Sequence, residues 1–319
     1  MTRSGSATSI PVMRSYRLRR GFLFGCMGRR SATLMASALL LLAAPGSAPA
    51  SATAQGDPKR GEYLAKAGGC LGCHTGKQND ASPFAGGRAL KTPFGTFHGP
   101  NITSHPEAGI GRWAEADFVR AMRRGERPDG ANYFPVFPYP SFTQMTDIDL
   151  RDLWAYVRLL PPSSRANQSH DLGFPYGWRA LVTVWKWFFF TPGPAAGDRQ
   201  AASVADRGRY LVQALGHCGE CHTPRNFLGA PLTDRFLAGG KTPDGKKAQN
   251  LTPARLKSWS DAELKQYFLT GETPDGDSAN ETMAEVITNT TSQLTPADLQ
   301  AMIVYLRTLP AIADEAKSK

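Results

Sequence analysis

The chain has 319 residues, enough for two domains of ordinary size, and its content of 41% hydrophobic and 20% charged residues is that of a globular protein. The net charge of +10 comes mostly from the first 54 residues, which contain seven of the 37 basic residues and no acidic one. The remaining 30 basic and 27 acidic side chains form no dense basic patch, which argues against nucleic acid as a partner.

Residues 1–54 have the features of an export signal. Arg29 and Arg30 precede an apolar stretch at 32–44, which is too short to span a bilayer. Small residues follow, and Ala52-Thr53-Ala54 matches the A-x-A cleavage pattern. We therefore expect cleavage after Ala54 and a periplasmic mature protein. The alternative is that this segment is retained as a single-helix anchor.

The rest of the chain consists of two similar halves. Each begins with an Arg-Gly-x-Tyr-Leu segment ahead of a Cys-x-x-Cys-His cluster, and the matching segments keep their order. Such internal similarity indicates a duplication. The matched segments are 60–64 with 207–211, 84–87 with 237–240, 101–103 with 250–252, and 125–130 with 271–276.

Capping signals predict helices in both halves. Asp57-Pro58 and Thr295-Pro296 each pair an N-cap acceptor with proline at the first helical position, and residues 260–263 form a capping box. The last helix of each half has apolar residues at a period of 3.6, and Pro161 and Pro310 follow these helices. No run of alternating strands is present. We therefore predict an all-α fold of two tandem domains, residues 55–162 and 204–319.

An aromatic-rich linker, residues 163–203, joins the two predicted domains. It contains Trp178, Trp185, Trp187 and three consecutive phenylalanines at 188–190. Residues 181–190 are too few to cross a bilayer, and Lys186 interrupts them. Two interpretations remain open. The aromatic side chains pack over both domains, or residues 181–190 form a docking surface for a partner protein or a peripheral contact with a membrane.

The two clusters carry the chemistry. After removal of Cys26 with the export signal, the remaining cysteines all belong to Cys-x-x-Cys-His, the attachment motif of c-type haem. The spacing places two sulfurs on one side of a helical turn, where they can form thioethers with one porphyrin, and the histidine can bind its iron. We therefore predict two covalently bound haem c groups. The residues involved are Cys70, Cys73 and His74 for the first and Cys218, Cys221 and His222 for the second.

Three other interpretations of the clusters are weaker. A zinc site needs four convergent ligands, and each cluster offers three. A thioredoxin-like redox pair needs a βαβ context, and the sequence shows none. Two plain disulfides would leave both histidines unexplained.

The sixth iron ligand decides whether a haem transfers electrons or binds substrates. Among the methionines after the export signal, Met302 lies in the apolar stripe of the last helix, and Met122 matches Phe268, so both are expected in the core. Met145 and Met283 remain as candidate iron ligands, one in each half. The alternative for both is a buried gap-filling role.

The repeat does not pair Met145 with Met283, because it places Phe137 at the position of Met283. Histidines therefore remain as alternative ligands of the first haem, with His98 the best placed. The others are His105, His170 and His217, of which His217 is too close to its own cluster to reach across a haem. Repeated polar and aromatic side chains are expected either to contact haem propionates or to be structural. They are Arg88, Asn101, Trp113, Asn250 and Trp259.

The sequence resembles the dihaem cytochromes c that accept electrons from periplasmic dehydrogenases. The resemblance spans roughly residues 57–310, and rests on the phrases AGGRALKTPFGTFHGPNIT, FPYPSFTQMTD, GHCGECHTPRN and TGETPDGDSANETMAEV. It implies tandem cytochrome c-like domains and, as axial ligands, Met145 and Met283. The related cytochrome subunits of membrane-bound alcohol and sugar dehydrogenases usually carry three haems and have methionine where this chain has Phe137.

These features predict an electron-transfer protein with two His/Met-ligated haems and no catalytic activity of its own. Electrons would come from a periplasmic dehydrogenase and pass to a soluble cytochrome or terminal oxidase of the respiratory chain. The alternative is a dihaem oxidoreductase of the peroxidase or thiosulfate dehydrogenase type, which needs one open or displaceable axial site. A structural or metal-buffering role is the third possibility.

Overall fold

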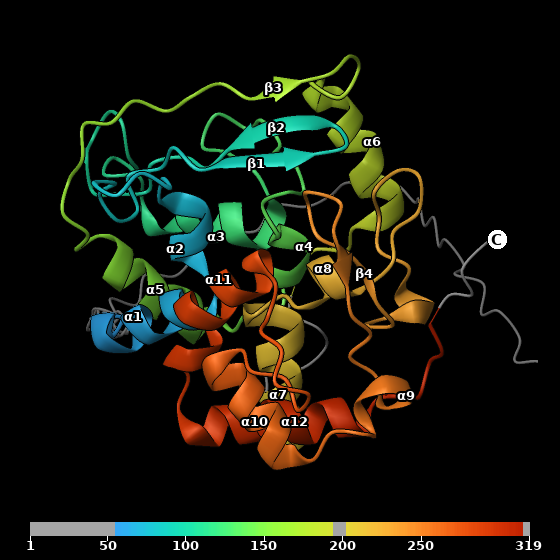
Figure 1. Ribbon diagram of the computed structural model, residues 1–319. Coiled ribbons are helices and arrows are strands. Elements are labelled where there is room, and N and C mark those ends of the chain that lie inside the picture. Colours follow the sequence, from blue (N-terminus) through green and yellow to red (C-terminus); the bar gives the residue numbers. More distant parts are fainter. Residues whose placement is uncertain (1–54, 194–201, 315–319) are drawn as a thin grey trace, which may run out of the picture. The chain divides into compact units, whose positions relative to one another are not determined.

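The computed structural model describes residues 55–193 and 202–314 (Figure 1). The predicted export signal at residues 1–54 lies outside the described residues. All of the described residues belong to one compact unit that spans residues 53–319.

Helices are the commonest regular elements of the described chain, and a few short strands accompany them. The first part contains α1 (Pro58–Ala67), α2 (Cys70–His74), β1 (Ala89–Thr92), β2 (Gly95–His98), α3 (Glu115–Arg124), α4 (Tyr139–Phe142), α5 (Asp147–Val157), β3 (Asp171–Leu172) and α6 (Arg179–Phe189). The second contains α7 (Val204–Tyr210), the π-helical turn η1 (Leu211–Leu215), α8 (Gly219–His222), η2 (Thr233–Arg235), β4 (Gly240–Lys241), β5 (Lys247–Ala248), α9 (Pro253–Leu256), α10 (Asp261–Thr270), α11 (Glu281–Asn289), η3 (Thr291–Gln293) and α12 (Pro296–Thr308).

The predicted helix caps are confirmed. The Asp57 carboxylate accepts hydrogen bonds from the backbone N–H groups of Lys59 and Arg60 at 2.9 and 3.3 Å. The capping box at residues 260–263 begins α10, and Thr295 caps α12 ahead of Pro296. Local capping chemistry therefore sets where these helices begin.

The strands were not anticipated, and the all-α prediction is not confirmed. Antiparallel β1 and β2 pair from Ala89↔His98 to Thr92↔Gly95, and β3 adds to the outer edge of β2. Strands β4 and β5 pair in the second half. At two to four residues, these strands are too short to show the alternation by which a strand is recognised in sequence.

The repeated Arg-Gly-x-Tyr-Leu segments lie where two pairs of helices pack closely. Helix α1 packs on α5, and α7 packs on α12. At these crossings a Cβ atom on Gly61 would lie 2.0 Å from the carbonyl oxygen of Asp152, and one on Gly208 would lie 1.9 Å from that of Ala301. Glycine is therefore required in both segments by the close approach of two backbones.

The arginine and tyrosine of each segment bind two buried carboxylates in a reciprocal pattern. Arg207 bonds Asp298 in its own half at 2.6 and 2.8 Å, whereas Tyr63 from the other half donates its hydroxyl to Asp298 at 2.6 Å. Correspondingly, Asp149 accepts from Arg60 of its own half and from Tyr210 of the other. Each carboxylate therefore links both halves.

The predicted linker packs on both halves and also exposes an aromatic surface. It supplies β3 and α6 (Figure 1). Val182 on α6 packs with Phe97 and Phe134 of the first half. The Trp185 indole N–H donates to the carbonyl of Leu228 in the second half at 3.1 Å. Trp187 and neighbouring aromatic side chains remain exposed. No helix in the described ranges is both long enough and apolar enough to cross a membrane.

Removal of the crossing hydroxyl groups should loosen the contact between the halves. We expect Tyr63→Phe and Tyr210→Phe each to lower the free energy of unfolding by roughly 1.5–3 kcal/mol, because each removes a hydrogen bond to a charged carboxylate. Denaturant unfolding of the haem-loaded protein measures the effect. Tyr156→Phe is the control, since Tyr156 packs edge-on against Phe84 and touches neither carboxylate. Equal stability of all three variants would contradict the structural role of these bonds.

Candidate functional site

Both Cys-x-x-Cys-His clusters follow the first helix of their half through a tight turn. Gly69 precedes Cys70 with φ of 62°, and His217 precedes Cys218 with φ of 39°. The segment between Arg-Gly-x-Tyr-Leu and the first cysteine is one residue longer in the second half. The π-helical turn η1 accommodates the extra residue, with a hydrogen bond from the Gly216 N–H to the carbonyl of Leu211. The longer segment places a histidine where the first half has glycine.

The two motif histidines have the same orientation. His74 Nδ1 lies 2.8 Å from the carbonyl oxygen of Pro100, and His222 Nδ1 lies 2.6 Å from that of Gln249. A carbonyl accepts only from a protonated nitrogen, so Nε2 of each ring keeps its lone pair for a metal. Burial lowers the pKa of both rings, which favours the neutral form that binds iron.

The cysteines are free thiols in surroundings that suit thioether formation. All four are half-buried and none forms a disulfide. Burial raises the pKa of Cys70 and of Cys218 to about 12, so these thiols stay neutral. Within the described ranges, no group of three or more His, Cys, Asp or Glu side chains could hold a bare metal ion. The donor set therefore fits two haem groups attached through paired thiols.

The two clusters are neighbours. His217 Nε2 lies 3.3 Å from the carbonyl oxygen of Gly68, just before the first cluster. The His217 and Phe142 rings pack edge to face, with their centroids 5.4 Å apart. Burial raises the pKa of Cys221 to about 11, and nearby Cys73 contributes in the same direction. The structure thus brings the predicted attachment residues of both halves together.

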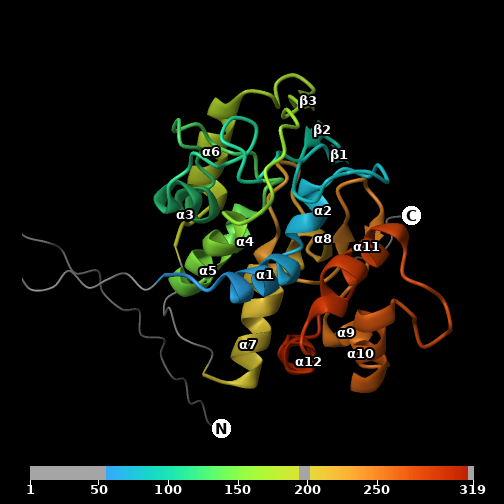
Figure 2. The ribbon, with the colours of Figure 1, turned by 90° about the vertical axis from the view of Figure 1, so that its left-hand side faces the viewer.

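Helix α11 of the second half lies beside α2, as Figures 1 and 2 both show. Arg88 and Glu285 form a bidentate ion pair across this contact at 2.7 and 2.6 Å. They line a hollow of about 310 Å³ together with Gly72 and Lys77. Arg88 is therefore already paired with a carboxylate of the other half.

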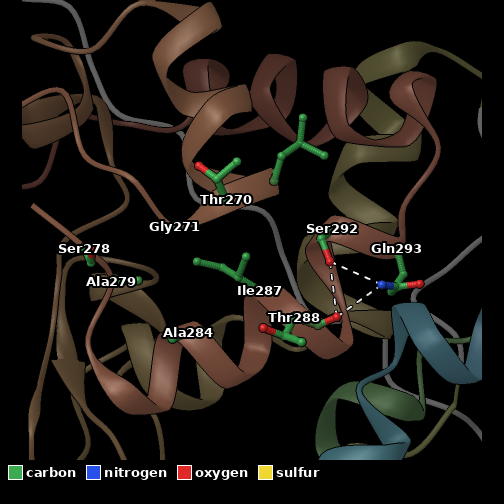
Figure 3. A pocket seen from close by; sticks show the side chains of 10 residues that line it. Thr270, Gly271, Ser278, Ala279, Ala284, Ile287, Thr288, Ser292 and Gln293 are labelled. Atoms are coloured by element: carbon green, nitrogen blue, oxygen red, sulfur yellow. Dashed lines mark hydrogen bonds between the residues drawn. The ribbon is translucent and has the colours of Figure 1, made fainter. Parts of the chain in front are cut away.

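A second pocket, of about 240 Å³, lies between the end of α10 and α11 (Figure 3). Ala284, Ile287 and Thr288 line it, and none of its described lining residues is Cys, His or Met. Residues on a helix are about 100° apart, so Met283 lies about 160° around α11 from Glu285. Met283 is thus on the side of α11 opposite the first-half contact.

The four methionines of the described chain differ in burial. Met122 and Met302 are in the hydrophobic core, as predicted. Met283 is half-buried near the start of α11, where its N–H donates to the Asn280 side chain at 3.0 Å. Met145 has no exposed surface and directly precedes Thr146, the N-cap of α5. The assignment of Met145 and Met283 as iron ligands stays a prediction.

The alternative histidines lie elsewhere. His98 and His105 flank the segment whose Pro100 carbonyl bonds His74 Nδ1, which is the nitrogen opposite the one left free for iron. His170 Nδ1 accepts the backbone N–H of His98 at 3.1 Å. None of these histidines is brought to the free nitrogen of His74 by a contact in the described chain.

The repeated asparagines have a structural role. The Asn101 amide donates to the carbonyls of Ser163 and Arg165, after the last helix of the first half. In the second half, the Asn250 amide donates to the carbonyl of Ile312 and to the side-chain carboxylate of Asp314. Each asparagine thus holds the segment that follows the last helix of its half against that half.

Sequence reasoning did not identify the carboxylate links or one buried hydroxyl. The only sequence signal for Tyr63 and Tyr210 is that tyrosine recurs at the same place in both Arg-Gly-x-Tyr-Leu segments. Tyr139 is fully buried, and its hydroxyl has no hydrogen-bond partner in the described chain. No sequence pattern marks that hydroxyl.

Comparison with known proteins places the chain among cytochromes. Residues 58–161 match the family model Cytochrome c. The chain is 46% identical over 266 residues to a "Diheme cytochrome c-type" protein of Cereibacter sphaeroides, covering 81% of this chain and 87% of that protein.

Two further relatives are longer than this chain. Identity to the "Fructose dehydrogenase cytochrome subunit" of Gluconobacter japonicus is 39% over 298 residues, or 90% of this chain and 61% of the subunit. Identity to the "Alcohol dehydrogenase (quinone), cytochrome c subunit" of Gluconobacter oxydans is 35% over 268 residues, or 80% and 55%. With two attachment motifs and these similarities, the chain belongs to the cytochrome c family and is a dihaem cytochrome c with two covalently bound haem c groups.

Proposed function

We propose that this dihaem cytochrome carries electrons from a dehydrogenase to the respiratory chain. The observation that carries the proposal is the contact between the two clusters at His217, Gly68 and Phe142. Adjacent attachment sites place two redox groups within one protein interior, where an electron can pass between them. Bound haem supplies reversible one-electron chemistry at its iron. The chain supplies the paired thiols, the oriented histidines and a buried environment.

We assign the attachment residues by half. Cys70, Cys73 and His74 hold one haem, and the matching residues of the second cluster, Cys218, Cys221 and His222, hold the other. Residues 55–162 and 204–319 form duplicated domains joined by residues 163–203. Support for this division comes from the matching helix crossings, the matching Asp–Arg–Tyr contacts and the matching asparagine ties.

Loss of one pair of thiols should remove one haem and leave the other. We expect the exported Cys70→Ser/Cys73→Ser variant to show an intact mass lower by one haem, because the second pair of thiols is independent. Cys218→Ser/Cys221→Ser should give the same mass loss. Cys26→Ser is the control, since Cys26 lies in the predicted export signal. Retention of two covalent haems by either double variant would refute the assignment.

We place the protein in the periplasm, with a dehydrogenase as donor and a soluble cytochrome or terminal oxidase as acceptor. Support comes from the predicted export signal and from relatives that are cytochrome subunits of fructose and alcohol dehydrogenases. His222 and Met283 are the proposed axial ligands of the second haem. Thioether sulfur opposite histidine favours the ferrous state and so a high reduction potential.

Substitution of Met283 should change one potential only. We expect Met283→Ala to lower the midpoint potential of one haem by roughly 0.1 V or more, since axial ligands set haem potentials over about 0.8 V. Potentiometric titration followed optically measures both haems. The control is the core variant Met122→Leu. A second experiment tests the electron donor. Alcohols, sugars or sugar acids added to a periplasmic extract should reduce the wild-type haems. An unchanged pair of potentials would remove Met283 from the site, and no reduction by any substrate would contradict a dehydrogenase donor.

We further propose that the exposed face of α6 contacts a membrane surface. Trp187 and Phe188 are 79% and 74% exposed on this face. The two cations of α6 turn inward, where Arg179 and Lys186 both bond Asn132. A short helix with an uncharged aromatic face and no spanning length suits the interfacial zone of a bilayer.

Polar residues on this face should weaken vesicle binding. We expect Trp187→Ser/Phe188→Ser to bind phosphatidylcholine vesicles roughly tenfold or more weakly, because two aromatic side chains no longer enter the interface. Co-sedimentation with vesicles gives the affinity. Leu159→Ser is a matched control, since Leu159 is an exposed apolar residue just beyond α5. Equal binding by wild type and the double variant would rule out this surface.

A further inference from the structure

We propose that the first haem has no methionine on the side opposite His74, so that it binds a small neutral ligand such as carbon monoxide, whereas Met283 closes the second haem. The inference rests on the proposed attachment of both haems. It goes beyond electron transfer because it assigns a ligand-binding site to one half only.

The structure aligns the two halves at the turn before the candidate methionines. Gly130 and Gly276 both have φ of 81°, in turns closed by the matching bridges Glu126↔Asn132 and Glu272↔Ser278. The next residue of each half, Tyr133 or Ala279, donates its N–H back to the glycine that ends the preceding helix, at 2.7 and 2.8 Å. Four residues beyond these equivalent positions stand Phe137 and Met283.

The halves align again at the start of their last helices. Thr146 and Thr295 are the N-caps, and each has its backbone N–H within 3.4 Å of the tyrosine hydroxyl of the other half. The residues directly before these caps are Met145 and Leu294, which are 0% and 8% exposed. Met145 therefore occupies the position of a core leucine.

The two alignments differ because the second half is three residues longer between the turn and its last helix. Neither alignment places a methionine of the first half at the position of Met283. Counting back twelve residues from Thr295 gives Met283, and the same count from Thr146 gives Phe134. Counted from the turn, the equivalent residue is Phe137. In either register the first half has phenylalanine where the second has methionine.

The packing of Met145 supports the same conclusion. Its side chain is enclosed by the hydrophobic core on all sides, whereas Met283 and Phe137 are half-buried. The backbone next to Met145 is held by the Thr146 cap, whose side chain accepts the Asp149 N–H and whose N–H lies 3.4 Å from the Tyr210 hydroxyl of the other half. The predicted Met145 ligand is therefore better explained as a core residue.

Three of the four histidines outside the attachment motifs are engaged elsewhere, whereas His98 Nδ1 is buried without a hydrogen-bond partner in the described chain. His98 lies two residues before Pro100, whose carbonyl bonds the Nδ1 of His74 and not the nitrogen left free for iron. His217 binds the Gly68 carbonyl, and His105 Nδ1 accepts the backbone N–H groups of Glu107 and Ala108. The His170 ring packs against Phe97 and Phe134 while its Nδ1 accepts the His98 N–H.

The surroundings of Phe137 define the class of ligand. Its ring contacts Tyr133, Tyr139 and Phe142 at centroid distances of 5.4, 6.3 and 5.8 Å. An aromatic environment of this kind favours a neutral diatomic molecule over an anion, which would lose its hydration. The buried Tyr139 hydroxyl, which has no hydrogen-bond partner in the described chain, can donate to the outer atom of such a ligand.

Carbon monoxide titration of the reduced, haem-loaded protein tests the proposal. We expect one carbon monoxide bound for every two haems. Phe137→Met should abolish this binding, Met145→Leu should leave it unchanged, and Met283→Leu should raise it to two. Tyr139→Phe should shift the C–O stretching frequency in the infrared spectrum without changing the stoichiometry.

Three outcomes would overturn the inference. If the wild type binds none and Met145→Leu binds one, Met145 is the ligand. If both bind none, another side chain closes the first haem. If the wild type binds two, the halves do not differ. Intact mass gives the haem count separately, so a protein with fewer than two haems would contradict the proposed function rather than this inference.

Discussion

Two buried carboxylates, Asp149 and Asp298, hold the two halves of this cytochrome in one arrangement. A buried carboxylate is costly unless it is paired and hydrogen-bonded, and each is bound by an arginine of its own half and a tyrosine of the other. Both lie in the first turn of a helix, where the helix dipole favours a negative charge. Either half alone would leave a carboxylate without its tyrosine donor. Each half therefore supplies a hydrogen-bond donor that the buried carboxylate of the other half needs.

This arrangement sets the positions of the attachment clusters and of the residues that precede the last helix of each half. It brings the attachment clusters together at His217 and Gly68, so two redox centres share one interior. It also encloses Met145 and Leu294 just before the helix caps that the tyrosines bind. Matching helices, caps and attachment motifs thus occur in both halves, while the segment before the last helix carries Phe137 in one half and Met283, on α11, in the other. On the proposed assignment, the two haems therefore differ through one residue in this segment.

Features that depend on local chemistry were predictable from the sequence. Capping residues, helical periodicity and the attachment motifs act within a few residues of one another, and the caps at Asp57, Ser260 and Thr295 lie where expected. Features that depend on distant partners were not. The two-residue strand β3 exists because the chain after α5 returns to β2, and the Tyr63–Asp298 bond joins residues 235 positions apart. The repeat did reveal Phe137, whereas the burial of Met145 came from the structure.

The central claim is that the two haems, held by matching attachment motifs, differ in their axial methionine. Proton magnetic resonance of the fully reduced protein is the most direct test, because the methyl group of an iron-bound methionine lies over the porphyrin ring and is strongly shielded by it. The account predicts one such shielded methyl signal for a protein with two haems. Two signals would show that both halves use methionine and would contradict it.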